Sequence, residues 1–276
     1  MSTEEKVASH YTHGSLETAI LQTLAENGKD IDNLRLRDLA GVDEFHLGRH
    51  AATAEFARDL DLAAGLLLAD IGSGLGGPAR HFADAYGCTV SGIDLTDEFV
   101  QVANSLTARC GLADRVSFRQ GSALSLPFES GGFDRTTLIH VGMNIEEKAA
   151  LFGEIRRILK PGGRFGLYEI MQMREGTLPY PMPWAMTPET SFVRSPAIYR
   201  QLLEEAGFVV ELEQDRSALA IRLAHEARAK AASAGEGGNP GIRTLMGPRA
   251  SERSGNVNTS VEAGLLAPIE MIARAV

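Results

Sequence analysis

The chain has 276 residues, a net charge of −9 and 44% hydrophobic residues, which is an ordinary globular composition with room for one large core, or a core and a small lobe. The excess of acids argues against binding to a nucleic-acid backbone, because proteins that bind phosphates usually present a basic face. The sequence contains no apolar run of about 20 residues, so no membrane span is predicted. The N-terminus is polar and lacks the pattern of a secretory leader, which predicts a cytoplasmic location.

The first 60 residues are predicted to form a helical region distinct from the rest of the chain. Apolar residues recur at helical spacing over 16–24, and Gly28 ends that helix. Residues 43–48 are expected to form a loop. A helix over 50–60 then leads into the first strand, so the domain boundary is placed between 60 and 61.

From residue 66 onward, strand and helix patterns alternate, which indicates a doubly wound α/β fold with a mostly parallel sheet. Helices are predicted over 78–86, 97–109, 146–159 and 199–206. Seven strands are predicted, the last as an edge strand: 66–70, 89–94, 116–120, 133–140, 164–170, a strand from 208 onward, and 270–276.

Two segments within 61–276 interrupt this alternation. Residues 171–195 contain four prolines and the only tryptophan, Trp184. Long irregular segments in a compact domain are usually functional lids or disordered, and we expect this one to form a wall of the substrate site. For the second segment, at about 230–262, a mobile flap and disorder are both open.

The most informative motif follows the first strand of this alternating pattern. It reads Asp70-Ile-Gly72-Ser73-Gly74-Leu-Gly-Gly, and a second acid, Asp94, ends the next strand at the distance expected for a ribose-binding carboxylate. Glycines allow a ligand to approach the backbone closely. Proteins that bind NAD carry a similar turn, and a turn that binds nothing is a third interpretation. The acid at the head of the turn favours S-adenosylmethionine (SAM), because Asp70 could hold the cationic methionine end.

Together with other motifs, this turn resembles the class I SAM-dependent methyltransferases over about residues 35–215. The resemblance also rests on segments 92–95 (Gly-Ile-Asp-Leu), 131–134 (Gly-Gly-Phe-Asp), 159–163 (Leu-Lys-Pro-Gly-Gly) and 206–208 (Ala-Gly-Phe). Within that superfamily the chain looks most similar to methyltransferases of small amines, namely the sarcosine/dimethylglycine and phosphoethanolamine enzymes. That second resemblance rests on segments 10–14, 45–48, 74–80 and 180–185.

The resemblance implies a Rossmann-like fold with residues 1–60 as a helical lid, and it implies the roles of the cofactor residues. Gly72, Ser73 and Gly74 would line the methionine end of SAM, with Asp70 behind them. Asp94 would bind the ribose hydroxyls and Leu95 would lie beside the adenine. The family usually has an acid for the adenine amino group after strand three. Here that acid is missing, and Ser122 and Ala123 stand in its place.

Methyl transfer to an amine requires a proton acceptor. His140, at the carboxyl end of strand four, is the first candidate, and a structural histidine is the alternative interpretation. Tyr11 is the second candidate, in the segment that relatives fold over the site, with a packing role as its alternative. In the phosphoethanolamine enzymes an acid precedes the strand-four histidine by four residues. Here the two positions hold His140 and Asn144, which argues against a phosphobase.

Asn144 and Trp184 are predicted to contact the substrate. Asn144 could instead cap a helix, and Trp184 could face an ammonium group or pack within its proline-rich loop. No histidine or cysteine spacing predicts a metal site. The residues do not decide between a monomer and a homodimer.

Three functions stay open for the whole chain. The first is transfer of a methyl group from SAM, giving S-adenosylhomocysteine (SAH), to a small amine such as sarcosine or dimethylglycine. The second is C-methylation of a quinol or another apolar small molecule. The third is a SAM-binding protein without catalysis. An NAD-dependent oxidoreductase is the weakest alternative.

Overall fold

A computed structural model describes residues 2–12, 14–234 and 249–276. A seven-stranded sheet with the order β3-β2-β1-β4-β5-β7-β6 forms the centre. Strands β1 to β5 are parallel to one another, and β7 is antiparallel to both β5 and β6. The prediction of a doubly wound, mostly parallel sheet is confirmed. The strands are β1 (Leu67–Ile71), β2 (Thr89–Asp94), β3 (Val116–Gln120), β4 (Phe133–Ile139), β5 (Leu159–Gln172), β6 (Phe208–Asp215) and β7 (Leu266–Ala275).

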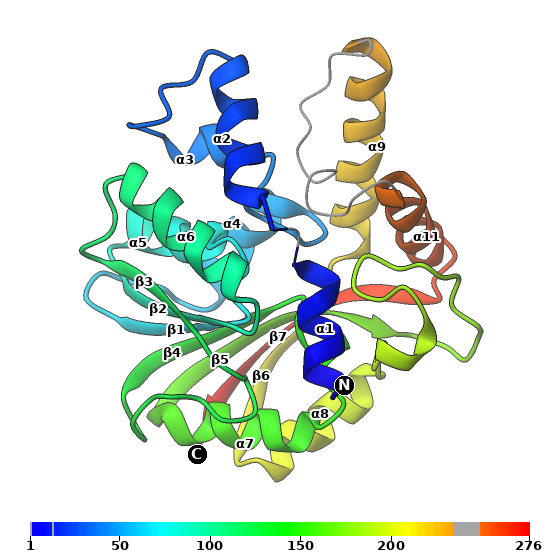
Figure 1. The fold of residues 1–276 in the computed structure, drawn as a ribbon. Coiled ribbons are helices and arrows are strands. Elements are labelled where there is room, and N and C mark those ends of the chain that lie inside the picture. Colours follow the sequence, from blue (N-terminus) through cyan, green and yellow to red (C-terminus); the bar gives the residue numbers. More distant parts are fainter. Residues whose placement is uncertain (1, 13, 235–248) are drawn as a thin grey trace.

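Helices cover both faces of the sheet. Figure 1 shows α5 and α6 on one face and α7 and α8 on the other. Proline in the first turn of α5 and a left-handed glycine at its end set that helix between β1 and β2. The bounds are α1 (Thr3–Tyr11), α2 (Leu16–Glu26), α3 (Leu36–Leu39), α4 (Arg49–Asp59), α5 (Gly77–Tyr86), α6 (Asp97–Arg109), α7 (Lys148–Ile158), α8 (Pro196–Glu205), α9 (Ser217–Ala234) and α11 (Ala250–Glu262).

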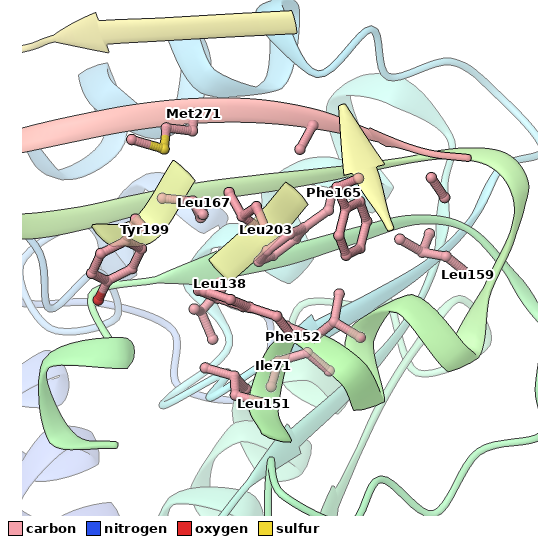
Figure 2. Close-up of a cluster of buried hydrophobic side chains, with 14 of the residues drawn as sticks. Ile71, Leu138, Leu151, Phe152, Leu159, Phe165, Leu167, Tyr199, Leu203 and Met271 are labelled. Carbon is pink, nitrogen blue, oxygen red and sulfur yellow. The ribbon is translucent and has the colours of Figure 1, made fainter. Parts of the chain in front are cut away.

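Separate hydrophobic clusters fill the two sides of the sheet. On one side, residues of α7 and α8 pack on β1, β4, β5 and β7 (Figure 2). Phe152, Phe165, Tyr199 and Leu203 are fully buried there. On the other side, Phe56 of α4 and Phe82 of α5 pack with residues of β1, β2, β3, β5 and β7. Because both faces of the central strands are covered, β1 and β7 are buried along nearly their whole length.

The last strand corrects one prediction. Residues 270–276 were expected at an edge of the sheet, yet β7 lies between β5 and β6 and begins four residues earlier. It is buried along nearly its whole length. Its position follows from the antiparallel pairing with β6, which a single-strand pattern does not encode.

The two irregular segments have different outcomes. Residues 173–195 contain only a short 3-10 turn (Pro188–Thr190) and an isolated bridge, so the irregular path is confirmed there. The second segment is partly helical, since α9 extends to Ala234 and α11 begins at Ala250. The choice between flap and disorder concerns residues 235–248, which lie outside the described residues. Helices α9 and α11 lie side by side (Figure 1).

The N-terminal region is helical as predicted. Helix α1 begins with a capping box, in which Ser2 and Glu5 bond to each other's backbone. Helix α2 packs through Leu16, Ile20 and Leu24 against α6. Among the described residues, no helix is long and apolar enough to cross a membrane.

Candidate active site

The candidate site is a cavity at the carboxyl ends of β1, β2 and β4, roofed by α1 and the loop over 42–46. The strand order runs outward from β1 in both directions, so these ends form the switch point where open α/β sheets bind ligands. The cavity brings together Tyr11, Asp70, Gly72, Asp94, Ala123 and His140, and most of the other predicted cofactor residues. Segments far apart in the sequence therefore meet at one place.

The glycine turn after β1 has the geometry that its sequence predicts. Gly72, Gly74 and Gly76 all have positive φ, which side chains disfavour. A Cβ at Gly72 would lie 2.3 Å from Val141 Cγ2, so only glycine fits there. The N–H groups of Gly72 and Ser73 both donate to Ile93 O, at 2.7 and 2.9 Å. The turn is thus held against the end of β2 with its surface open to the cavity.

Asp70 is a buried carboxyl at the head of this turn. Its Oδ1 accepts a hydrogen bond from Thr137 Oγ1 at 2.7 Å. Its Oδ2 has no hydrogen-bond partner in the described structure. Burial raises the pKa of Asp70 to about 6, although the bond from Thr137 lowers it. A buried acceptor without a partner beside a ligand-sized cavity fits the ammonium group of a bound amino acid.

Asp94 lies at the end of β2 and is also buried. Its Oδ2 accepts from Gly74 N at 2.8 Å and its Oδ1 from Thr96 N at 2.9 Å. Burial raises the pKa of Asp94, against the effect of these backbone bonds. Each carboxylate oxygen has a second acceptor site, so ribose hydroxyls can still bind. The carboxylate therefore links the glycine turn to the nucleoside end of the cavity.

The nucleoside end of the cavity is lined mainly by apolar side chains, with Glu4 of α1 beside them. Leu95, Phe99, Ala123 and Leu124 line it. Ser122 is not among the lining residues; its hydroxyl is hydrogen-bonded to Glu4 of α1 and accepts from Leu124 N at 3.1 Å. Ser122 thus shapes the loop after β3 rather than facing the cavity itself.

Tyr11 and Asn144 meet across 133 residues of sequence. Tyr11 Oη donates to Asn144 Oδ1 at 3.2 Å, and Asn144 Nδ2 donates to Trp184 O at 2.8 Å. Burial raises the pKa of Tyr11 well above its usual value, so the phenol stays protonated. Tyr11, the predicted second candidate for the proton acceptor, and Asn144, the predicted substrate contact, both line the cavity. The capping role that was open for Asn144 is not used, because its side chain bonds to Tyr11 and Trp184.

Trp184 lies in a different environment from the one predicted. Its ring packs with Met143, Ile170 and Met182 in a buried cluster, and its Nε1 donates to Ser191 Oγ at 2.9 Å. It is not among the residues that line the cavity. Its position fits the packing role within the proline-rich loop and not contact with an ammonium group in the cavity.

His140 lines the cavity, but backbone groups occupy both of its ring nitrogens. Nδ1 lies 3.0 Å from Tyr168 O, and Leu47 N donates to Nε2 at 3.3 Å. A carbonyl requires a donor and an N–H requires an acceptor, so the ring is a neutral Nδ1–H tautomer. Burial, together with the nearby His46, lowers the pKa of His140 to about 3. The geometry matches the structural interpretation that was left open, since a proton acceptor here would first have to break the bond from Leu47.

His46 and Glu44 also belong to the site, although sequence reasoning gave them no role. His46 lines the cavity with its ring 5.7 Å from that of His140. Its Nε2 lies 3.1 Å from Thr53 Oγ1, which donates to Glu44 Oε2 at 2.9 Å. Burial alone would raise the pKa of Glu44, but hydrogen bonds with His46 and His50 lower it to about 2. The sequence motif over 45–48 does not reveal this network, because Glu44 lies on a loop and Thr53 on α4, and only the fold brings both to His46.

A buried acid and a buried lysine fix the loop after β4. Glu169 Oε1 accepts from Val141 N and Gly142 N, at 2.8 and 3.0 Å. Lys148 Nζ donates to the carbonyls of Gly142, Ile145 and Phe192. Burial raises the pKa of Glu169 and lowers the pKa of Lys148. These bonds hold Val141 against Gly72 and Asn144 against Tyr11.

No three His, Cys, Asp or Glu side chains gather at metal-binding distance within the described ranges. The two cysteines, Cys88 and Cys110, are free thiols.

Comparison with known proteins agrees with this geometry. Residues 69–167 match a family model described as a methyltransferase domain. A sterol 24-C-methyltransferase of Eremothecium gossypii is 28% identical over 190 residues, covering 63% of this chain and 51% of that protein. Another from Gibberella zeae is 34% identical over 113 residues, covering 41% and 30%. The chain thus spans about half, or less, of the length of these curated relatives.

Solved structures share the fold over almost the whole chain. Phosphoethanolamine N-methyltransferase 2 of Haemonchus contortus, in complex with SAM, superposes with a TM-score of 0.74 at 19% identity, over 100% of this chain and 60% of that one. The [4+2]-cyclase SpnF gives 0.70 at 24% identity, over 99% and 97%. A putative sarcosine dimethylglycine methyltransferase of Galdieria sulphuraria gives 0.65 at 18% identity, over 85% and 92%. At these identities the likeness establishes the fold. Residues 69–167 thus match the model of a methyltransferase domain, the chain as a whole shares the fold of these structures, and the narrower likeness to small-amine enzymes is not established.

Proposed function

We propose that this chain transfers the methyl group of SAM to an uncharged, largely apolar small molecule. One observation carries the choice of acceptor: among the described residues that line the cavity, none is lysine or arginine. An acceptor with a phosphate or carboxylate would bury a further anion, besides the carboxylate of SAM itself, without a cationic partner, which is costly. Phosphoethanolamine, sarcosine and dimethylglycine all carry such a group.

The acids of the cavity suit a cationic cofactor. We infer that Asp70 receives the ammonium group of SAM, that the turn over Gly72–Gly74 holds its amino-acid end, and that Asp94 binds the ribose. Leu95 and Ala123 flank the base. When bound, SAM supplies a methyl group already activated on a sulfonium. The chain's own residues hold it and exclude water through α1.

Tyr11, Phe45, Ile139, Val141 and Asn144, which we assign to the acceptor end, are uncharged, while Glu146 and Glu147 also line the cavity. We infer that Tyr11 and Asn144 orient a polar group of the acceptor, because their hydrogen bond fixes both side chains. His140 positions the loop over 46–47 and is not assigned as the proton acceptor. Both curated relatives described above are named sterol 24-C-methyltransferases, and these names support carbon as the methylated atom.

Methylation of a small amine is the second candidate. The carboxylates that line the cavity could attract an ammonium group, and the fold is shared with enzymes whose titles name amine substrates. An amine without an anionic group would be compatible with this lining, because its ammonium group could pair with the acids and it has no anion that needs a lysine or arginine. Sarcosine and dimethylglycine would not.

Incubation with methyl-labelled SAM and an acceptor panel tests the proposal. The panel holds a side-chain-unsaturated sterol, a short-chain quinol, a simple tertiary amine, sarcosine, dimethylglycine and phosphoethanolamine. We expect label in a neutral acceptor and none in the zwitterions. Label in a zwitterion alone would overturn the acceptor class and leave the methyltransferase. SAM binding without transfer to any acceptor would favour a non-catalytic SAM-binding protein, and no SAM binding would overturn the whole proposal.

A further inference from the structure

The loop after β3 provides no carboxylate at the nucleoside end of the cavity. It reads Gly121-Ser122-Ala123-Leu124. A carboxylate is nevertheless present, because Glu4 of α1 lines the cavity and is hydrogen-bonded to Ser122 Oγ. Ser122 Oγ in turn accepts from Leu124 N at 3.1 Å. The loop therefore holds an acid that comes from more than 100 residues away.

Helix α1 presents one face to the whole length of the cavity. Thr3, Glu4, Val7 and Tyr11 all line it, and their spacing places them along one side of a helix. Glu4 lies beside the loop after β3 and Tyr11 bonds to Asn144 after β4. The same helix thus reaches both the nucleoside end and the acceptor end.

The chemistry at the nucleoside end calls for a hydrogen-bond acceptor. With the ribose at Asp94, the base lies beyond it, between Leu95 and the loop after β3. Adenine carries an exocyclic amine with two N–H donors there. A carboxylate has about four acceptor sites, and Ser122 takes one of them. Leu95, Ala123 and Leu124 offer side chains that pack but cannot accept.

We propose that Glu4 recognises the exocyclic amine of the adenine, so that bound cofactor holds α1 in its place over the cavity. This inference rests on the proposed SAM site. Ser122 is a positioning residue that acts through Glu4. Adenine recognition would then depend on the N-terminal helix instead of the loop after β3.

The test measures binding in the full chain by calorimetry, with SAH and with its 6-deamino analogue, in which hydrogen replaces the amine. The wild type is expected to bind SAH about ten- to a hundredfold more tightly than the analogue, because the analogue lacks one hydrogen bond to a charged group. Glu4→Ala is expected to bind the two ligands nearly equally. Ser122→Ala is expected to reduce the preference by a smaller factor.

Glu5→Ala is the matched control. It removes the same charge from the next position and breaks the capping box with Ser2, so it loosens α1 without touching the proposed contact. We expect weaker binding of both ligands with an unchanged ratio. The ratio separates recognition from a structural role, which would weaken both ligands alike.

Three results would overturn the inference: a wild-type ratio near one, an unchanged ratio in Glu4→Ala, or an equal change of ratio in Glu5→Ala. Circular dichroism of the ligand-free variants checks folding. If Glu4→Ala does not fold, the wild-type ratio and Ser122→Ala decide. Failure of the wild type to bind SAH at all would instead remove the proposed function itself.

Discussion

At the residue scale, Asp70 combines a functional position with a cost in stability. Its pKa in the folded chain, about 6, lies above the ordinary value of 3.8 because the carboxyl is buried. An acid whose pKa is raised by folding destabilises the fold when it is ionised. That cost is absent below pH 4, grows between pH 4 and 6, and is complete above pH 6. Residues that bind cationic ligands often sacrifice stability in this way.

We therefore expect Asp70→Asn to stabilise the ligand-free chain at pH 8 by about 1–3 kcal/mol and to weaken SAM binding at least tenfold. At pH 4 the variant and the wild type should unfold alike. Urea unfolding at the two pH values and calorimetry at pH 8 measure these effects. Asp114→Asn, at an exposed position, is the control. A less stable Asp70→Asn at pH 8 would contradict the assigned cost of burial.

Gly72 is a second residue with a specific geometric constraint. Its φ is 71° and a Cβ there would meet both Cγ atoms of Val141. Gly72→Ala should lower the free energy of unfolding by about 2–4 kcal/mol, from strain in the left-handed region and from the clash. Gly65→Ala has a similar φ of 82° and nothing within 4 Å, so it isolates the cost of backbone strain.

The double variant Gly72→Ala/Val141→Ala separates the two costs further. Removing both Cγ atoms of Val141 leaves a contact of 3.0 Å to its Cβ. We expect the double variant to lose less free energy of unfolding than the sum of the losses in the two single variants. Urea unfolding of all three variants measures the difference. Simple additivity would show that the clash is relieved by movement of the backbone.

At the element scale, α1 is attached to the rest of the chain by few but directed contacts. Tyr11 bonds to Asn144, and its ring lies 5.7 Å from that of Phe99 and 6.4 Å from that of Phe45. Arg253 of α11 binds the carbonyl of Met182 at 3.0 Å and also contacts His10 of α1. The helix is therefore held by side chains from four other segments. The lid role of residues 1–60 stays a prediction.

A double-mutant cycle with Tyr11→Phe and Asn144→Ala measures the attachment of α1 to the loop after β4. The coupling energy between the two side chains is expected to be about 0.5–1.5 kcal/mol, the value of one neutral hydrogen bond. If the pair orients the acceptor, both single variants should raise KM for the acceptor and leave the Kd for SAH within about twofold. A change confined to the Kd for SAH would place Tyr11 in cofactor binding instead.

At the scale of the whole molecule, the two faces of the sheet have different tasks. Phe152 of α7 is fully buried beside Phe165 and Tyr199 (Figure 2), and it is not among the residues that line the cavity. Phe152→Ala should destabilise the chain by about 3–5 kcal/mol through lost burial and a cavity. Chemical denaturation measures this cost. The folded fraction should still bind SAH with wild-type affinity, and a comparable loss of affinity would show that the two faces are coupled.

Local patterns in the sequence determined most of the fold. Alternating apolar strands and amphipathic helices, with the glycine turn between two acids, indicate the sheet, its parallel core and the place of the ligand, because each signal depends on neighbours within a few residues. The internal position of β7, the helix α9 and the buried packing of Trp184 depend on partners elsewhere in the chain. The sequence pattern carries no trace of those partners.

The functional site divides along the same line. The sequence by itself determined Asp70, Gly72 and Asp94, because one short turn and the end of the following strand place them together. Only the tertiary structure decided that backbone groups occupy both nitrogens of His140, that Tyr11 bonds to Asn144, and that Glu4 stands beside Ser122. The contacts of Leu47 with His140, of Tyr11 with Asn144 and of Glu4 with Ser122 each join residues more than 90 positions apart, and Tyr168 lies 28 positions from His140. Their energies depend on distance in space, which periodicity along the chain does not encode.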